Sequence, residues 1–346
     1  MAQCRPRVIV GVDERPQSER ALDFAAWEAH SRSARLDLVR GLEMPFPSSH
    51  AAYIPYREAA HVWISRLAEK TRRRYPDLEI VGSTVAGSGA AALLDRATEN
   101  DLIVVGSRSR STVRSILLGS VSTAVAAHAP CPVIVVRGEP QERAETQERG
   151  ETREQGGPMP QAESHEAAEA HEARRQSGKA VGGRRVVVGI DGSETGRAAA
   201  AFAFDEAARR GLPLDVVYVW SLDPFSAPGL WAAQMPMDEY VRDSEQVVKD
   251  EIVEFRRRYP QVEVQVRVLY GRPSQVLAER SAGTALLVVG SRGRGGIAGL
   301  LLGSVSQGVL HHANCPVAVV HPASTAHAVP APRSDVPAPR GDGRQE

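Results

Sequence analysis

Two glycine-rich segments, one in each half of the chain, contain residue types that suit anion binding. In the first, Leu102-Ile-Val-Val-Gly106-Ser-Arg-Ser109 is followed after nine residues by Gly119-Ser120-Val121-Ser122. In the second, Leu286-Leu-Val-Val-Gly290-Ser-Arg-Gly293 is followed after nine residues by Gly303-Ser304-Val305-Ser306. An apolar strand that ends in glycines, before a Gly-Ser pair that opens a helix, points unpaired backbone N–H groups at one spot. The predicted chemistry is therefore the binding of a phosphate group.

These two segments belong to a repeat that spans most of the chain. Arg72-Arg-Arg-Tyr75-Pro76 recurs as Arg256-Arg-Arg-Tyr259-Pro260, an offset of 256 − 72 = 184. Asp13 pairs with Asp191 at an offset of 191 − 13 = 178, so the second copy has gained six residues, which we expect in the proline-rich stretch 221–237. Tandem domains produce such a long period, whereas solenoids repeat over much shorter ones.

Composition divides the chain into two domains, a linker and a tail. We expect the first domain at 1–138, a disordered linker at 139–183, the second domain at 184–322 and a disordered tail at 323–346. Glu, Gln, Arg, Ala and Gly dominate the linker, which has too little apolar surface to offset the entropy of ordering. The tail is rich in Pro, Ala and Arg, which is equally typical of disorder.

Each copy alternates short apolar runs with amphipathic helical stretches. In the first copy, strands are expected at 7–13, 36–42, 79–85, 102–106 and 132–137, and helices at 18–32, 57–75, 90–99 and 119–128. In the second copy, strands are expected at 185–191, 214–220, 263–269, 286–290 and 316–321, and helices at 196–210, 238–259, 273–282 and 304–313. Strict alternation of this kind predicts an α/β fold with two tandem doubly wound, Rossmann-like domains. Each would be a five-stranded parallel sheet with helices on both faces.

The carboxyl ends of the strands are the expected location of the site, because ligands of such sheets bind beyond those ends. Asp13 and Asp191 end the first strand of each copy, and Gly106 and Gly290 end the fourth. Each Asp and its Gly can flank one cleft if the first and fourth strands are neighbours. The Gly-Ser pairs also have a purely structural interpretation as helix caps, and so do the two aspartates.

Overall composition argues against several classes of partner. Lys and Arg total 42 and Asp and Glu total 42, so the net charge of zero gives no support to binding of nucleic acid driven by overall charge. No apolar run approaches the roughly 20 residues that span a bilayer, and no signal peptide is visible. The three cysteines lack the spacing of a metal site, and Cys131 and Cys315 are expected to be buried in a reducing cytosol. We therefore expect a cytoplasmic protein with no metal site, no membrane partner and no nucleic-acid partner.

The combined motifs resemble the universal stress protein family. They are Asp191-Gly-Ser193 near the start of the copy, Val289-Gly-Ser-Arg-Gly293 before the nine-residue gap, Gly303-Ser-Val-Ser306, and Cys315-Pro-Val-Ala-Val-Val320 at the end. The chain looks like a tandem member, because the resemblance covers both copies and leaves out only the linker and the tail. Family members that bind ATP do so through this motif, so the resemblance implies ATP, with Mg²⁺, as the ligand.

In the second copy the resemblance implies a nucleotide site with three parts. The glycines would let the backbone approach the phosphates, the helix start would hold phosphate oxygens, and residues at the ends of the first two strands would contact adenine and ribose. The implied residues are Ile190, Asp191, Val219, Gly290, Arg292, Gly293, Gly303, Ser304, Val305 and Ser306. Arg292 also suits an ordinary surface loop.

The first copy departs from this pattern, and we expect it to bind nucleotide more weakly or not at all. Its corresponding residues are Val12, Asp13, Gly41, Gly106, Ser109, Gly119, Ser120, Val121 and Ser122. Ser109 replaces the second motif glycine, which is costly if that position needs positive φ or close approach to a phosphate. Glu14 replaces Gly192 and adds negative charge, which loop arginines 108, 110 and 114 would offset. Conversely, the first copy keeps Ser18 where the second has Gly196.

Three functions stay open at this stage. The first is a nucleotide-responsive stress or regulatory protein whose conformation a partner protein reads. The second is a weak ATPase or phosphotransferase, which the lack of a G-x4-G-K-[ST] loop and of any lysine in either candidate loop disfavours. The third is a scaffold module that binds no nucleotide. We name no catalytic residue.

The last strand of each copy lies at a sheet edge in the family arrangement, and such edges seek a partner. We therefore expect residues 132–137 and 316–321 to pair the two domains as an internal pseudo-dimer, with the same surfaces available for a homodimer.

Overall fold

A computed structural model describes residues 6–43, 50–107, 118–137, 184–221, 237–293 and 302–322. Side chains of residues 50–52 and 237–238 lie outside this description. The described residues do not include Ser109 or the loop arginines 108, 110 and 114. They also leave out the expected linker 139–183, the expected tail 323–346 and most of the proline-rich stretch 221–237.

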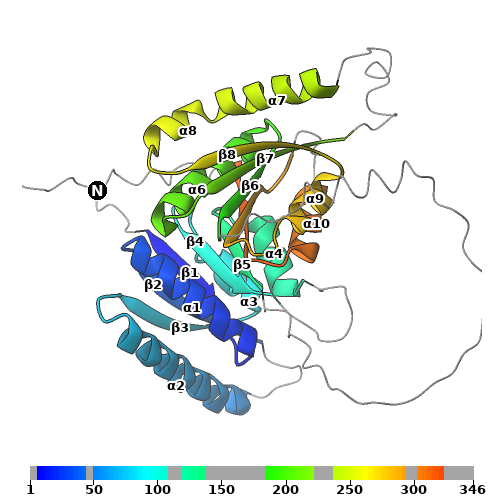
Figure 1. The fold of residues 1–346 in the computed structure, drawn as a ribbon. Helices are drawn as coiled ribbons and strands as arrows, with labels where there is room; N and C mark the ends of the chain where they lie inside the picture. The colour runs from blue at the N-terminus through cyan, green and yellow to red at the C-terminus, as the bar shows by residue number, and fades with distance from the viewer. Residues whose placement is uncertain are drawn as a thin grey trace, which may run out of the picture.

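The first half alternates strands and helices in the expected order (Figure 1). Its elements are β1 (Arg7–Gly11), α1 (Pro16–Ser31), β2 (Arg35–Leu42), α2 (His50–Arg74), β3 (Ile80–Ala86), α3 (Gly89–Leu94), β4 (Leu102–Gly106), α4 (Ser120–His128) and β5 (Val133–Val136).

The second half repeats that order. Its elements are β6 (Val186–Ile190), α6 (Glu194–Arg210), β7 (Leu214–Trp220), α7 (Met237–Glu251), α8 (Val253–Arg258), β8 (Val264–Tyr270), α9 (Pro273–Glu279), β9 (Leu286–Gly290), α10 (Ser304–His312) and β10 (Val317–Val320).

Within the described residues, the strands form one ten-stranded sheet in the order β3-β2-β1-β4-β5-β10-β9-β6-β7-β8. All neighbours within a half are parallel, and the α/β fold predicted from the sequence is confirmed. β1 and β4 are neighbours, and so are β6 and β9, so each aspartate and its glycine loop share an edge of the sheet. The strand order reverses between these strands, where an open α/β sheet forms its ligand crevice.

The two halves join through β5 and β10, which pair antiparallel with Val317 opposite Val135 and Val319 opposite Val133. The predicted internal pairing of the two halves through their last strands is therefore confirmed. Both strands are fully buried, so neither presents an open edge that would attract another chain.

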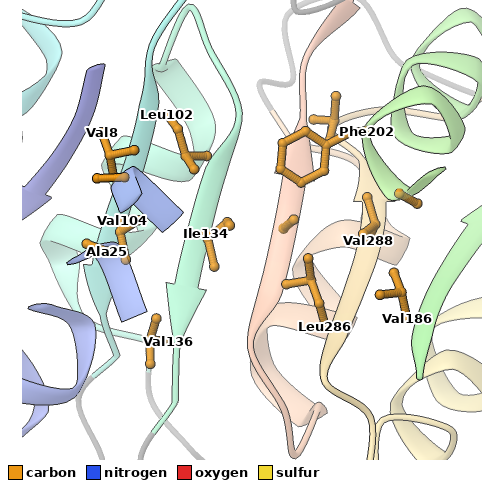
Figure 2. Packing of buried hydrophobic residues seen from close by; sticks show 14 of the residues in the cluster. Val8, Ala25, Leu102, Val104, Ile134, Val136, Val186, Phe202, Leu286 and Val288 are labelled. Atoms are coloured by element: carbon orange, nitrogen blue, oxygen red, sulfur yellow. The ribbon is translucent and has the colours of Figure 1, made fainter. Parts of the chain in front are cut away.

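Helices cover both faces of this sheet, and two apolar layers run across both halves. One layer packs α1, α2, α6 and α7 against one face, and the other packs α3, α4, α9 and α10 against the opposite face. Figure 2 shows Val8 and Val104 of the first half and Val186 and Val288 of the second within the first layer. Runs such as Leu102–Val105 are buried on both sides, which explains why they are continuous rather than alternating.

A ring of four buried charges lies where α1 packs on α6. In each half an arginine bonds to the glutamate four residues earlier: Arg32, the C-cap of α1, donates through Nε to Glu28 at 3.0 Å, and Arg210 of α6 donates through Nε to Glu206 at 2.9 Å. Across the halves, Arg32 donates to Glu206 and Arg210 donates to Glu28. Both glutamates are 0% exposed, and each pair is related by the repeat offset, 206 − 28 = 178 and 210 − 32 = 178.

Local signals set the ends of α6. Ser193 is its N-cap and accepts a hydrogen bond from the Gly196 N–H at 3.0 Å, which satisfies one of the first unpaired amides. Gly211 ends the helix in the left-handed conformation at φ 60°, which glycine adopts without steric cost.

Three helices differ from the prediction by the most. α2 begins at His50 rather than 57 and contains Pro55, whose missing N–H removes one helical bond near the start. The single helix expected at 238–259 is two helices, α7 and α8, separated at Ile252, whose φ of −97° and ψ of 3° leave the helical region while its side chain is fully buried.

The third difference is α3, which ends at Leu94 rather than 99. The reason is a turn held by the Asp101 carboxylate, which accepts the Thr98 N–H at 2.8 Å and the Thr98 hydroxyl at 2.8 Å. Arg7 on β1 also donates to that carboxylate, at 3.0 Å and 2.6 Å. Contacts from a distant strand therefore override local helix propensity.

Candidate functional site

The second glycine loop ties the end of β9 to the start of α10. The Gly303 N–H donates to the Ser291 carbonyl at 2.8 Å, and the Ser306 hydroxyl donates to the Gly290 carbonyl at 2.6 Å. The backbone bond from Gln307 to the Gly303 carbonyl is the first helical bond, at 3.0 Å. The N–H groups of residues 304–306 therefore precede the helical ladder and emerge at the helix start, where negative charge is stabilised.

The first loop has the same framework in its described part. The Ser122 hydroxyl donates to the Gly106 carbonyl at 2.8 Å, and the first helical bond runs from Thr123 to Gly119 at 2.9 Å. Gly119 caps α4 in an extended conformation, as Gly303 caps α10. The hydroxyls of Ser122 and Ser306 are thus used to hold the loop, which leaves the backbone as the source of free donors.

The glycines of the second loop are explained by close contacts with the β6–α6 connection. A Cβ on Gly290 would lie 2.8 Å from Thr195 Oγ1 and 2.9 Å from the Thr195 backbone, and a Cβ on Gly293 would lie 2.7 Å from Asp191 Oδ2. Gly293 is not among the described residues with positive φ. Gly293 is therefore not required for a positive φ. It is required because a side chain at this position would collide with the Asp191 carboxylate.

A chain of hydroxyls connects Asp191 to the second loop. Asp191 Oδ1 accepts bonds from the Ser193 N–H at 3.1 Å and the Ser193 hydroxyl at 2.5 Å. Ser193 Oγ lies 3.0 Å from Thr195 Oγ1, and the Thr195 hydroxyl donates to the Arg292 carbonyl. Arg292 itself is exposed. Ser193 and Thr195 are outside the glycine motif and were not predicted as site residues, although two hydroxyl residues spaced two apart at a helix start are a visible signal in the sequence.

The first half builds the same connection differently. The Asp13 N–H donates to Ser18 Oγ at 2.7 Å, and the Asp13 carboxylate accepts from the Arg15 N–H at 3.0 Å. Arg15 and Gln17 occupy the repeat positions of Ser193 and Thr195, so the hydroxyl chain has no counterpart here. Asp13 therefore stabilises the turn that precedes α1. It is not the N-cap of that helix, which is Arg15.

Glu14 is paired with an arginine that the sequence analysis did not consider. Arg40 Nη2 donates to the Glu14 carboxylate at 3.0 Å, and the Arg40 guanidinium stacks over the Trp63 ring at 4.8 Å. Along β2, Leu36 and Leu38 face the α1–α2 layer, and strand alternation places Arg40 on that same side. The negative charge of Glu14 is therefore compensated by Arg40 on the α1–α2 side of the sheet.

The ends of the second strands also differ between the halves. Val219 is partly buried and packs against the α9–α10 layer. A Cβ on Gly41 would lie 2.6 Å from the Gly89 nitrogen and 2.9 Å from the Ser88 carbonyl carbon, so the start of α3 rests directly on this point of β2. Val12 directly follows β1 and Ile190 is the last residue of β6. Both are 5% exposed and pack in the apolar layer that contains α1 and α6.

Cys131 and Cys315 are free and buried, as expected, and burial raises the pKa of each thiol to about 12. Among the described helices, none is long and apolar enough to cross a bilayer. In that same part of the chain, no group of three or more His, Cys, Asp or Glu side chains is arranged to hold a metal ion.

The fold and the loops define a class of protein, a tandem Rossmann-like α/β protein with a glycine-capped helix start beside the carboxyl end of the fourth strand in each half. A comparison with known protein families matches residues 5–137 and 183–321 to the universal stress protein family. The chain therefore belongs to that family, and both halves are universal stress protein units.

Individual relatives agree with this assignment. Universal stress protein Rv2005c of Mycobacterium tuberculosis is 31% identical over 330 residues, which cover 90% of this chain and 96% of that protein. A universal stress protein of Archaeoglobus fulgidus has the same fold at 19% identity, with a TM-score of 0.59 over 91% of this chain and 96% of that one. A solved universal stress protein in complex with cAMP is similar to a single half, at 28% identity over 39% of this chain and 98% of that chain, with a TM-score of 0.31.

Proposed function

We propose that the second half binds ATP at the edge of the sheet formed by the carboxyl ends of β6, β7 and β9. The observation that carries the proposal is the start of α10, where the amides of Ser304, Val305 and Ser306 precede the helical ladder beside Asp191. The phosphates would lie at that helix start and along Gly290 to Gly293, with Arg292 near them. Ile190, Asp191 and Val219 would contact the ribose and adenine.

Mg²⁺ would enter this site with the triphosphate. Its ligands would be phosphate oxygens and waters, because Mg²⁺ keeps several waters and usually takes only one or two carboxylates from a protein. Asp191 is the carboxylate at this edge, and its Oδ1 already accepts two bonds from Ser193. The residues thus fit a nucleotide that brings its metal rather than a resident metal ion.

We further propose that the second half is the better nucleotide site. Thr195 and Ser193 link the loop to Asp191 there, whereas Arg15 and Gln17 provide no such link in the first half. In the first half, the start of α3 also lies so close to Gly41 that a side chain such as that of the equivalent Val219 would not fit at the end of β2. Because Arg40 compensates Glu14, the predicted repulsion between Glu14 and a polyanion is a weaker reason for the difference than these packing effects.

The wider role follows from this site. We propose a nucleotide-responsive stress or regulatory factor that acts in the cytoplasm, with domains at 1–138 and 184–322, and whose occupied state a partner protein or a second copy of the chain recognises. Weak ATP hydrolysis is the alternative. It predicts phosphate release above the uncatalysed background from purified protein, which the regulatory proposal does not.

The decisive experiment places a carboxylate at the start of α10. Gly303 is extended and a Cβ there has its nearest neighbour at 3.4 Å, so side chains are accommodated. Aspartate and serine are both good N-caps, so Gly303→Asp and Gly303→Ser should each keep the melting temperature of the full chain. Gly303→Asp should lower ATP affinity at least about tenfold by charge repulsion, and Gly303→Ser by less than about threefold.

The matched pair in the first half is Gly119→Asp and Gly119→Ser, and the ATP affinity of all four variants is measured by isothermal titration calorimetry on the full chain. If the second half is the better site, the charge at 119 will have the smaller effect on total ATP affinity. Unchanged ATP binding in Gly303→Asp would refute the assignment of the phosphate site.

A further inference from the structure

The helix that forms the proposed phosphate site in the second half is capped by a side chain from the first half. Arg137 follows β5 directly and is 7% exposed. Its guanidinium donates to the carbonyls of Val309 at 3.4 Å and His311 at 3.5 Å, and also to that of Leu310. These three carbonyls belong to the last turn of α10, at the end opposite Gly303.

The reverse contact joins the second half to α4. His321 follows β10 directly, and its Nε2 lies 3.1 Å from the Ala126 carbonyl in the last turns of α4. The two capping residues are equivalent in the repeat, because 321 − 137 = 184. Each site helix is therefore capped at its carboxyl end by the other half, by an arginine for α10 and by a histidine for α4.

The two caps differ in charge at neutral pH. Burial lowers the pKa of Arg137 to about 10, so the guanidinium stays protonated. Burial also lowers the pKa of His321, so its imidazole is neutral at pH 7. Among the described residues, no carboxylate forms an ion pair with Arg137, and its guanidinium donates to the α10 carbonyls instead.

A charge at this end of α10 acts on the other end. The helix has nine residues, which span roughly 13 Å. Its unpaired carbonyls carry about half a negative charge, which opposes an anion at the helix start. A buried guanidinium that covers those carbonyls cancels this opposition and adds attraction, and solvent screens a buried charge much less than an exposed one.

We propose that Arg137 is a positioning residue for the nucleotide site of the second half, so that the first half supplies, through α10, part of the attraction for the phosphates. This inference rests on the proposed function of that site. The first half receives no equivalent charge from His321. The affinity of the second half for a polyphosphate thus depends on its pairing with the first half, whereas its affinity for an uncharged nucleoside does not.

The test compares ATP with adenosine on the full chain. All proteins carry Gly119→Asp, so that only the second half binds, and the Arg137→Gln, Arg137→Lys and Arg137→His variants are titrated with both ligands at pH 7.5. Loss of a unit charge at least about 13 Å from the several negative charges of the triphosphate, in a partly screened medium, should weaken ATP about three- to tenfold. Adenosine affinity should stay unchanged, and Arg137→Lys should retain most of the ATP affinity.

Arg137→His guards against loss of folding, because the equivalent position of the repeat already contains a histidine. It should behave like Arg137→Gln at pH 7.5. Equal weakening of ATP and adenosine, or ATP affinity unchanged by both Gln and His, overturns the inference alone. An absence of ATP binding in the Gly119→Asp parent refutes the proposed function of the second half, and the inference with it.

Discussion

Replacing Arg32 by methionine will test the buried charge ring between α1 and α6. Arg32 bonds to Glu28 at 3.0 Å, donates to Glu206, and lies 3.7 Å from Asp205. Its side chain is 8% exposed and both glutamates are 0% exposed, so water cannot replace the lost partner. Removal of one member of a buried ion pair costs about 3–5 kcal/mol, and here the two buried glutamates would be left to share a single arginine, Arg210.

The measurement is urea unfolding of the full chain, followed by far-UV circular dichroism. Methionine keeps the length and apolar stem of the side chain, so the packing of α1 on α6 is disturbed as little as possible. The control is Lys70→Met, which removes an ion pair to Glu19 at 3.7 Å whose side chains are 73% and 67% exposed. That change should leave the unfolding midpoint within error, because exposed pairs contribute little.

The double variant Arg32→Met/Glu206→Met separates the charge effect from the loss of packing. It removes one cation and one anion and leaves Glu28 paired with Arg210, so it should be less destabilised than the sum of the two single variants. If Arg32→Met costs no more than Lys70→Met, or if the two single changes simply add, the ring does not stabilise the pairing of the halves.

Four further outcomes are expected. Burial raises the pKa of Glu28 from 4.5 to about 7. The contribution of Glu28 to stability is therefore present below pH 4.5 and is lost as the pH rises through about 7. Glu28→Gln should remove this part of the pH–stability curve. Burial lowers the pKa of His321 below 6.5, so its contribution is present above pH 6.5 and is lost as the pH falls, and His321→Gln should reduce the loss on acidification. Gly290→Ala should destabilise by about 1–3 kcal/mol through overpacking, whereas Gly303→Ala, with its nearest neighbour at 3.4 Å, should cost less in the same unfolding assay. Thr195→Val should weaken ATP binding several-fold and Thr195→Ser should restore it, and equal affinity of both variants would exclude a role for the hydroxyl chain.

The sequence predicted the strands better than the helices. β4, β7 and β9 have the predicted limits, because each is a run of buried residues that ends at glycine or at a polar break. The boundaries of α2, α3 and α7 depend on contacts with other elements, such as the Asp101 turn, that no local pattern contains. The pairing of β5 with β10 was predictable, because an apolar edge strand needs a partner, whereas its antiparallel direction came from the structure.

The site was predictable only where the repeat marked it. The glycines and the Gly-Ser pairs stood out because they occur twice, and their assignment to nucleotide contact stays a prediction. Arg137 and His321 were not singled out, since their partners lie 172–174 and 195 residues away in the chain. The sequence does contain one signal for the charge ring, because the Glu-x3-Arg pair at Glu28 recurs at Glu206.

The antiparallel junction at β5 and β10 has a geometric consequence. Strands within each half are parallel, so the carboxyl ends of one half point opposite to those of the other. The starts of α4 and α10, at Gly119 and Gly303, therefore lie at opposite edges of the sheet, related by an approximate twofold axis that passes through the junction. A ligand at one helix start would thus lie across the sheet from a ligand at the other, and the two ligands would approach the chain from opposite sides.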